Sequence, residues 1–328
     1  MKTIAITEIQ GVRIGQVENR EAATGCTVFV CEEMMNAGLD VRGGGPASRD
    51  SQLLNPLMAA PGVHAIVLGG GSAFGLDATG GVAKCLEERG IGFDVGITKV
   101  PLVVQSDLFD LTVGDSTVRP DFAMGYEAAK QALDAPNYQD GNYGAGCGCT
   151  VGKVAGMETC MKTGIGSYAV QIGELQVGAV VAVNSLGDIF DWKTGAKAAG
   201  LLTEDKKAFR NTDELMRSSI EIKENKFVEN TTIGVILTNA AFNKSQLCKI
   251  AGMGHDGYAR SIRPVHTTAD GDSIYAVSAG SIPADQDLVG ALAAEVMSEA
   301  ILNAVNSAES AYGFTAARDL DFLKGETV

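Results

Sequence analysis

The sequence predicts an α/β or α+β protein in which helices cover one or more sheets. Three short segments are apolar and rich in Val and Ile, as buried strands are, and they span residues 63–70, 177–184 and 231–239. Helix-like segments alternate with these strands, and no internal repeat is found. With 328 residues, 45% of them hydrophobic, the chain can form one large domain or two small ones.

Helical signals occur in both halves of the chain. The predicted helices span residues 75–88, 121–133, 244–262 and 285–305. The last helix begins with acidic residues, which favour a helix N-terminus, and it places Leu288, Leu292 and Val296 on one apolar stripe. An alternating segment, residues 273–278, predicts one further strand ahead of that helix.

Composition excludes several classes of partner. The chain has 26 Lys and Arg against 40 Asp and Glu, a net charge of −14, which argues against nucleic acid and anionic membrane surfaces. We expect no membrane partner, because no signal segment and no apolar run of spanning length is evident. Seven Cys form no paired framework, so a cytoplasmic protein with reduced thiols is the simplest interpretation.

A highly charged stretch lies before the third strand. Of the 27 residues in 203–229, 13 are charged, so we expect this stretch to be exposed and mobile, either as a tether or as a solvated helix and loop. It ends at Asn230–Thr231. Cutting that bond would place a free α-amino group beside the Thr231 hydroxyl, which becomes a usable nucleophile when a base accepts its proton. The dipeptide is equally compatible with an ordinary turn.

A Gly-rich segment, residues 144–153, ends in Lys153. It does not fit a phosphate-binding loop, because Cys147 stands where that motif needs Gly and Val154 where it needs Ser or Thr. Cys147 and Cys149 have no second pair at zinc-site spacing, so no metal site is predicted. Lys153 is either an ordinary surface lysine or a partly buried one with a lowered pKa, able to bind a nucleophile.

Residues 69–75 form a Gly-rich turn between a strand and a helix. The turn nearly matches the nucleophile elbow G-x-S-x-G around Ser72, but Phe74 stands where the second Gly is required. Nothing in the sequence places any of the three His, at positions 64, 255 and 266, near Ser72. The turn's backbone N–H groups can still line a pocket and bind a carbonyl or carboxylate.

Three further polar residues are candidates for catalysis. Asp270 and Asp272 flank Gly271 in what is either a simple turn or a pair of carboxylates that perturb each other's pKa. The pair is not a calcium loop, because Ser281 replaces the Glu at its twelfth position. Asn184 ends an apolar strand and is either a turn cap or an oxyanion donor.

In combination these segments resemble the L-aminopeptidase/D-esterase family of self-processing peptidases, which includes nylon-oligomer hydrolases. The resemblance covers most of the chain. The segments that carry it are residues 40–44, 70–77, 109–111, 144–146, 152–153, 183–184, 230–232, 255–257, 262–267 and 270–272.

The resemblance implies a four-layer αββα sandwich like that of N-terminal nucleophile hydrolases. It implies a single domain, residues 1–328, cut into an α chain (1–230) and a β chain (231–328) that remain together in a homotetramer or larger ring. Thr231 then matches the nucleophile. The matched assisting groups are Lys153, Asn184, Asp270 and Asp272. The matched substrate-pocket residues are Gly71, Ser72, Ala73 and Phe74. The expected substrate is a short peptide or amide, and no cofactor is implied.

Two departures from the family pattern concern the pocket. Cys147 and Cys149 stand where Thr and Ala are more usual, and residues 105–108 replace a more apolar approach to the Phe-Asp-Leu segment. The substrate therefore stays open. Two alternative functions also stay open, namely an ornithine-type acetyltransferase on a similar self-cut scaffold and a non-catalytic protein that binds a small molecule.

Overall fold

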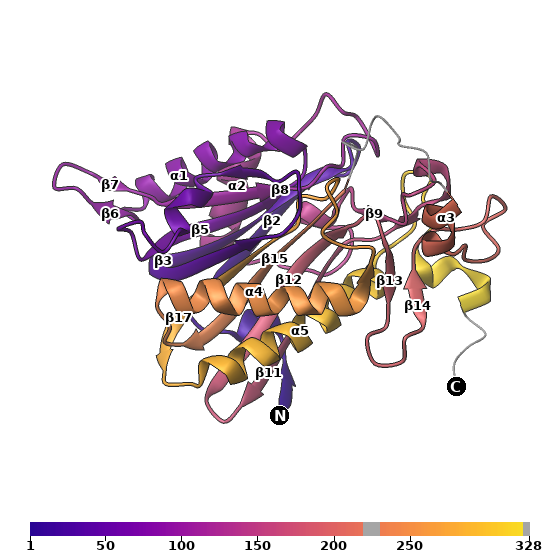
Figure 1. Ribbon diagram of the computed structural model, residues 1–328. Helices are drawn as coiled ribbons and strands as arrows, with labels where there is room; N and C mark the ends of the chain where they lie inside the picture. Colours follow the sequence, from indigo (N-terminus) through magenta and orange to yellow (C-terminus); the bar gives the residue numbers. More distant parts are fainter. Residues whose placement is uncertain (219–229, 324–328) are drawn as a thin grey trace.

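The computed structural model describes residues 1–218 and 230–323, and Figure 1 shows the arrangement of its helices and strands. A 10-stranded sheet has the order β1-β11-β12-β15-β17-β3-β5-β8-β4, with β2 also paired to β3. Its strands are β1 (Lys2–Ile4), β2 (Arg13–Asn19), β3 (Thr24–Val41), β4 (Ala47–Arg49), β5 (Gly62–Gly69), β8 (Val103–Asp107), β11 (Ile165–Ile172), β12 (Leu175–Asn184), β15 (Thr231–Ala240) and β17 (Ser273–Ile282).

Helices cover two different parts of this sheet. Figure 1 shows α1 and α2 on one side of the molecule and α4 and α5 on the other. The helices are α1 (Ala78–Glu88), α2 (Phe122–Asp134), α3 (Thr212–Ser218), α4 (Lys244–Ser261) and α5 (Gln286–Ser307). Smaller sheets and hairpins are built from β6 (Phe93–Asp94), β7 (Lys99–Val100), β9 (Thr150–Val151), β10 (Met161–Lys162), β13 (Asp188–Phe190), β14 (Lys197–Ala199) and β16 (Ile262–Arg263).

Three hydrophobic cores divide the molecule into four layers. One core lies between α4/α5 and the strands β11, β12, β15 and β17. A second lies between those strands and β2, β3, β5 and β8, and a third lies between β3, β5, β8 and the pair α1/α2. The predicted αββα sandwich is therefore confirmed. Its two β-layers are joined by the pairing of β17 with the long strand β3, so they form one continuous bent sheet.

Strand alternation explains why β15 contributes to two cores. Successive side chains of a strand point to opposite faces of a sheet. On β15, Ile233, Val235 and Leu237 lie in the core between the two β-layers, whereas Ile236 lies in the core shared with α4 and α5. Because both faces are covered, the strand is apolar along its whole length, and this made it recognisable in the sequence.

The predicted elements agree closely with the structure. The strands at 63–70, 177–184, 231–239 and 273–278 correspond to β5, β12, β15 and β17, and the four predicted helices correspond to α1, α2, α4 and α5. The first helix is shorter than expected, because residues Ser72–Asp77 form a 3-10 turn. Leu288 is 45% exposed and does not share the buried stripe of Leu292 and Val296, because it lies in the first turn of α5.

Two expectations about exposure concern helix α5 and the charged stretch before β15. The expectation that no apolar run reaches membrane-spanning length is wrong for helix α5, which is long and apolar enough to span a membrane, although 67% of its most apolar window is buried. It packs on α4, β11 and β12 as a core helix. In the charged stretch, most of residues 203–218 are exposed or half-buried, as expected, and residues 219–229 lie outside the described part of the chain.

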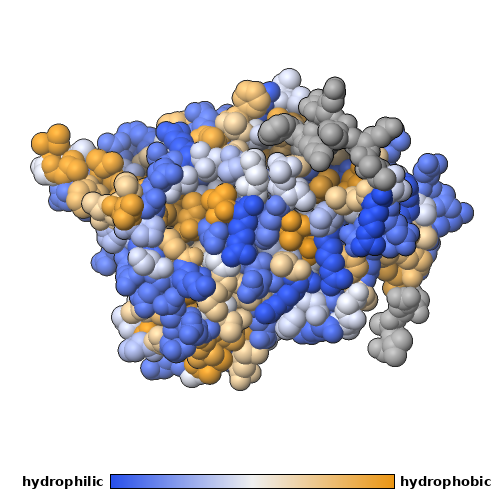
Figure 2. All heavy atoms as spheres, viewed as in Figure 1, coloured by the Kyte–Doolittle hydropathy of each residue, from blue (hydrophilic) through white to orange (hydrophobic). Residues whose placement is uncertain are grey.

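The β6–β7 hairpin projects from the body of the molecule. Figure 2 shows apolar residues gathered at its tip. Ile97 is 94% exposed and Phe93 is 54% exposed. A soluble protein rarely presents large apolar side chains together in this way unless a partner covers them.

Candidate active site

Thr231 and Asn184 are direct partners across two strands. Thr231 is the first residue of β15 and Asn184 the last of β12, and the two face each other in the antiparallel register. Both are buried, with exposed fractions of 4% and 0%. Thr231 shares the strand parity of Ile233, and Asn184 that of Ala182, and both of these lie in the core between the β-layers. The two side chains therefore meet at one end of the inner core.

The Thr231 hydroxyl lies against the peptide group that precedes it. Its Oγ1 donates a hydrogen bond to the carbonyl oxygen of Asn230. The same carbonyl oxygen accepts a hydrogen bond from the backbone N–H of Gly271, at 3.3 Å. The hydroxyl and the Asn230 carbonyl are thus held together in a buried setting, as an attack on that carbonyl requires.

Lys153 is buried and binds Asn184. Its side chain is only 6% exposed, so the surface-lysine alternative is wrong. Its Nζ lies 2.6 Å from Asn184 Oδ1 and 3.2 Å from the Asn184 carbonyl oxygen. The backbone N–H of Thr150 donates to the same Oδ1 at 3.0 Å. The ammonium group is therefore fixed beside the residue that faces Thr231.

The amide nitrogen of Asn184 is engaged as well. Its Nδ2 donates to the carbonyl oxygen of Phe109 at 2.7 Å. The two ends of this side chain thus connect the Gly-rich segment with the segment around Phe109. Asn184 orients its neighbours whether or not it also stabilises an oxyanion, which stays a prediction.

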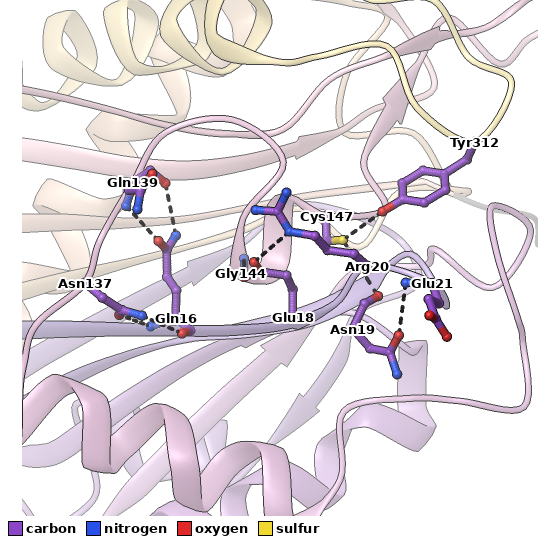
Figure 3. Close-up of polar contacts among 10 residues, drawn as sticks. All are labelled: Gln16, Glu18, Asn19, Arg20, Glu21, Asn137, Gln139, Gly144, Cys147 and Tyr312. Carbon is purple, nitrogen blue, oxygen red and sulfur yellow. Dashed lines mark hydrogen bonds and ion pairs between the residues drawn. The ribbon is translucent and has the colours of Figure 1, made fainter.

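The Gly-rich segment that carries Lys153 contacts β2 through Glu18 and the C-terminal part of the chain through Tyr312, as Figure 3 shows. The backbone N–H of Gly144 donates to Glu18 Oε2 at 3.0 Å, and the Cys147 thiol lies 3.3 Å from the Tyr312 hydroxyl. Burial raises the pKa of Cys147, and of Cys149 to about 12, so both stay neutral thiols. Because they are buried and neutral, these two cysteines of the Gly-rich segment contribute to packing and are poor nucleophiles.

Asp270 and Asp272 are both buried, with 1% of each exposed. Asp272 Oδ1 accepts the backbone N–H of Thr232 at 2.7 Å, and Asp270 Oδ2 accepts the backbone N–H of Thr267 at 2.9 Å. Burial first, and then the negative charge of Asp272, raises the pKa of Asp270 to about 6. The charge of Asp272 thus perturbs the pKa of Asp270, and Asp270 can gain and lose a proton near neutral pH.

The predicted pocket segment connects to the same network. The backbone N–H of Gly71 donates to Asp110 Oδ1 at 2.7 Å, and Asp110 directly follows Phe109, the partner of Asn184. Burial raises the pKa of Asp110 to about 6. Phe74 is 59% exposed, with the Arg119 guanidinium 4.0 Å from its ring centre. An exposed aromatic ring and a cation therefore stand at the open end of this turn.

A Ser-His pair at Ser72 is not formed. Ser72 has φ of 53°, as a nucleophile elbow would, but the three His bind elsewhere: His64 to Leu102, His255 to Asp40 and His266 to Asp272. Within residues 1–218 and 230–323, no group of three His, Cys, Asp or Glu side chains is arranged to hold a metal ion.

Comparison with known proteins shows the family of this chain. Residues 5–318 match Peptidase family S58. The chain belongs to this family. It is 34% identical to an uncharacterised aminopeptidase of Mycobacterium leprae, over 94% of this chain and 92% of that one. It is 30% identical to a 6-aminohexanoate-oligomer endohydrolase of Kocuria sp., over 90% of this chain and 84% of that one.

Two solved structures share the fold of this chain. An L-aminopeptidase D-Ala-esterase/amidase from Ochrobactrum anthropi, described as a variant of the Ntn hydrolase fold, matches with a TM-score of 0.65 at 17% identity, over 95% of this chain and 90% of that one. A beta-aminopeptidase of Burkholderia sp. matches with a TM-score of 0.63 at 20% identity, over 93% and 86%. The S58 chain thus has an Ntn-hydrolase-like fold. As a member of this peptidase family it is a hydrolase.

A cavity of about 830 Å³ lies away from these residues in the S58 chain. It is lined by residues 11–13, 30–36, 241–243 and 278–281. Residues 241–243 follow the end of β15 opposite to Thr231, so this cavity contains none of the predicted site residues.

Three groups beside the candidate site residues have no role in the sequence analysis. They are Gly271, the carbonyl of Phe109, and His266. A Gly between two candidate acids was a signal that backbone must pass closely there. The contacts of Phe109 and His266 depend on tertiary structure, and no local pattern in the sequence indicates them.

Proposed function

We propose that this S58 peptidase is a self-processing amidohydrolase whose nucleophile is Thr231, freed by cleavage of the Asn230–Thr231 bond. The observation that carries the proposal is the buried Thr231 hydroxyl, which contacts the Asn230 carbonyl and faces Asn184 and its bound Lys153. A threonine in an ordinary strand has no need of a buried ammonium group beside its cross-strand partner.

The processing step follows from these contacts. Thr231 Oγ1 attacks the carbonyl carbon of Asn230, the C–N bond breaks, and the nitrogen takes up the proton, leaving an ester on Oγ1. Water then hydrolyses the ester to give the Asn230 carboxyl group and a free Thr231. The N–H of Gly271, 3.3 Å from the Asn230 carbonyl oxygen, is placed to stabilise the negative charge that develops there.

Turnover uses the same hydroxyl. Thr231 Oγ1 attacks the substrate amide, an amine leaves with a proton, and water hydrolyses the acyl-enzyme. Lys153 and Asp270 are the proton-handling groups of the proposal, because one is held beside Asn184 and the other has a pKa near 6. Asn184 holds Lys153 in place and is also proposed as an oxyanion donor.

The proposed substrates are short peptides, amino-acid amides and 6-aminohexanoate oligomers. Their support is the aminopeptidase and 6-aminohexanoate-oligomer endohydrolase relatives, together with the exposed Phe74 and the neighbouring Arg119 at the pocket segment. A homo-oligomer in the cytoplasm is also proposed, and the exposed apolar tip of the β6–β7 hairpin supports the association.

The test compares two adjacent buried threonines. Thr231→Val and Thr232→Val make the same isosteric change one residue apart, and both side chains are buried. We expect Thr231→Val to yield one intact chain on a denaturing gel and no amide hydrolysis, whereas Thr232→Val is cut and active. N-terminal sequencing of the smaller wild-type band should begin at Thr231. A cut and active Thr231→Val protein would refute the proposal.

A further inference from the structure

His266 holds the carboxylate of Asp272 from two sides. The backbone N–H of His266 donates to Asp272 Oδ2 at 3.0 Å, and its ring Nδ1 lies 2.8 Å from the same oxygen. The other oxygen, Oδ1, accepts the N–H of Thr232 at 2.7 Å. Since an ionised carboxylate only accepts hydrogen bonds, Nδ1 carries the proton, and three N–H groups fix the orientation of Asp272.

The backbone and the ring of His266 are both constrained. Its φ of 57° lies in the left-handed region, which few residues other than Gly, Asn, Asp and His adopt. The ring packs against His255, with centroids 4.7 Å apart, and against Tyr258 at 5.9 Å. Its Nε2 is buried and has no hydrogen-bond partner among the described residues, so Asp272 is the group that orients the ring.

Cleavage changes what holds the nucleophile. Before the cut, Thr231 is attached through both of its peptide bonds. Afterwards it is the first residue of a chain, and its only covalent attachment is to Thr232. The hydrogen bond from Thr232 N–H to Asp272, together with the pairing of β15 with β12, then holds the peptide next to the nucleophile.

We propose that His266 is a positioning residue for turnover: by fixing Asp272 it anchors the Thr232 N–H and so places the freed Thr231 hydroxyl. This inference rests on the proposed function of Thr231. It assigns His266 no contact with the substrate. Its effect is on the geometry of attack, where a displacement of about 1 Å can cost about 100-fold in rate.

The test uses three substitutions at one position. Asn places an amide N–H close to where Nδ1 lies and tolerates positive φ, so His266→Asn should retain most of the wild-type kcat. His266→Leu has the same branched arrangement of heavy atoms as Asn but no donor, and His266→Gly removes the donor without backbone strain. Both should lower kcat by roughly tenfold to 100-fold with KM little changed.

A control separates this role from simple packing. His255→Gln alters the neighbouring ring, which binds the Asp40 carbonyl and not Asp272, and should leave kcat close to that of the wild type. Thermal unfolding is recorded for every variant. Equal loss of kcat in the Asn, Leu and Gly variants would mean that the ring, not the donor, matters, and wild-type kcat in the Leu and Gly variants would likewise overturn the inference. If Thr231→Val is inactive, both of these results for the His266 variants contradict only the role of His266 and leave the proposed function in place. An active Thr231→Val protein contradicts the proposed function itself.

Discussion

Gly271 packs so closely against Thr231 that a β-carbon on Gly271 would lie 2.7 Å from Thr231 Oγ1. Real β-carbons essentially never approach another atom so closely, and here the atom that must give way is the hydroxyl itself. The absence of a side chain at position 271 is therefore a condition for the position of this hydroxyl. Gly271 thus shapes the site in addition to donating its N–H to the Asn230 carbonyl.

Gly271→Ala should displace the Thr231 hydroxyl while keeping the backbone N–H. We expect slowed self-cleavage and a loss of activity of about 100-fold, because the nucleophile is moved from its attack geometry. Gly45→Ala is the matched control, since a β-carbon there has its nearest neighbours at 3.9 Å. Gel analysis over time and amide hydrolysis measure both effects. Normal cleavage and turnover in Gly271→Ala would contradict the steric argument.

Lys153→Met should remove the ammonium group from Asn184 while preserving much of the buried volume. A hydrogen bond to a charged group is worth about 1.5–3 kcal/mol, so we expect kcat to fall by roughly tenfold to 100-fold. Lys244→Met is the control. Lys244 is also buried, and it binds the carbonyl oxygens of Leu53, Asn55 and Met58, at the start of α4.

The two lysine variants should therefore affect different properties of the protein. Lys244→Met should lower the melting temperature and leave kcat unchanged, because its contacts are remote from Thr231. Lys153→Met should lower kcat whatever its effect on stability. Steady-state kinetics and thermal unfolding distinguish the two results, and equal kcat values for the two variants would exclude Lys153 from the chemistry.

Asp270→Asn should stabilise the fold at neutral pH and impair turnover. In the folded protein the pKa of Asp270 is raised from 3.8 to about 6, chiefly by burial and then by the charge of Asp272. The folded state therefore binds the proton more tightly than the unfolded state does. The contribution of this group to stability is complete below pH 3.8 and is lost as the pH rises through about 6.

The sign of this linkage fixes the result for Asp270→Asn. Asn is neutral at every pH, so the gain in melting temperature over the wild type should be larger at about pH 7.5 than at about pH 4. Asp110, whose pKa is also raised to about 6, is present in both proteins and cancels in the difference. A gain that is equal at both pH values would show that Asp270 carries no such linkage. At both pH values, amide hydrolysis by Asp270→Asn should be much slower than hydrolysis by the wild type.

Much of the fold was predictable because buried strands and helices have characteristic patterns of apolar residues. β12 and β15 are apolar on both faces, since cores lie on both sides of them, and α4 begins with a capping box at Asn243 and Gln246. The 18-residue strand β3 was not predicted. Its sequence mixes buried apolar residues with exposed acids such as Glu32 and Glu33, and its extent is set by pairing with β2, β5 and β17.

The sequence by itself determined the α/β class, with helices covering sheets, and a set of polar residues that are candidates for catalysis, because hydrophobic periodicity and residue chemistry are local properties. Only the tertiary structure decided that Lys153 is buried against Asn184, that Asp270 has a raised pKa, that Gly271 lies against Thr231, and that His266 lies against Asp272. Burial, hydrogen-bond partners and close approach all depend on which distant segments meet, and no short stretch of sequence records that.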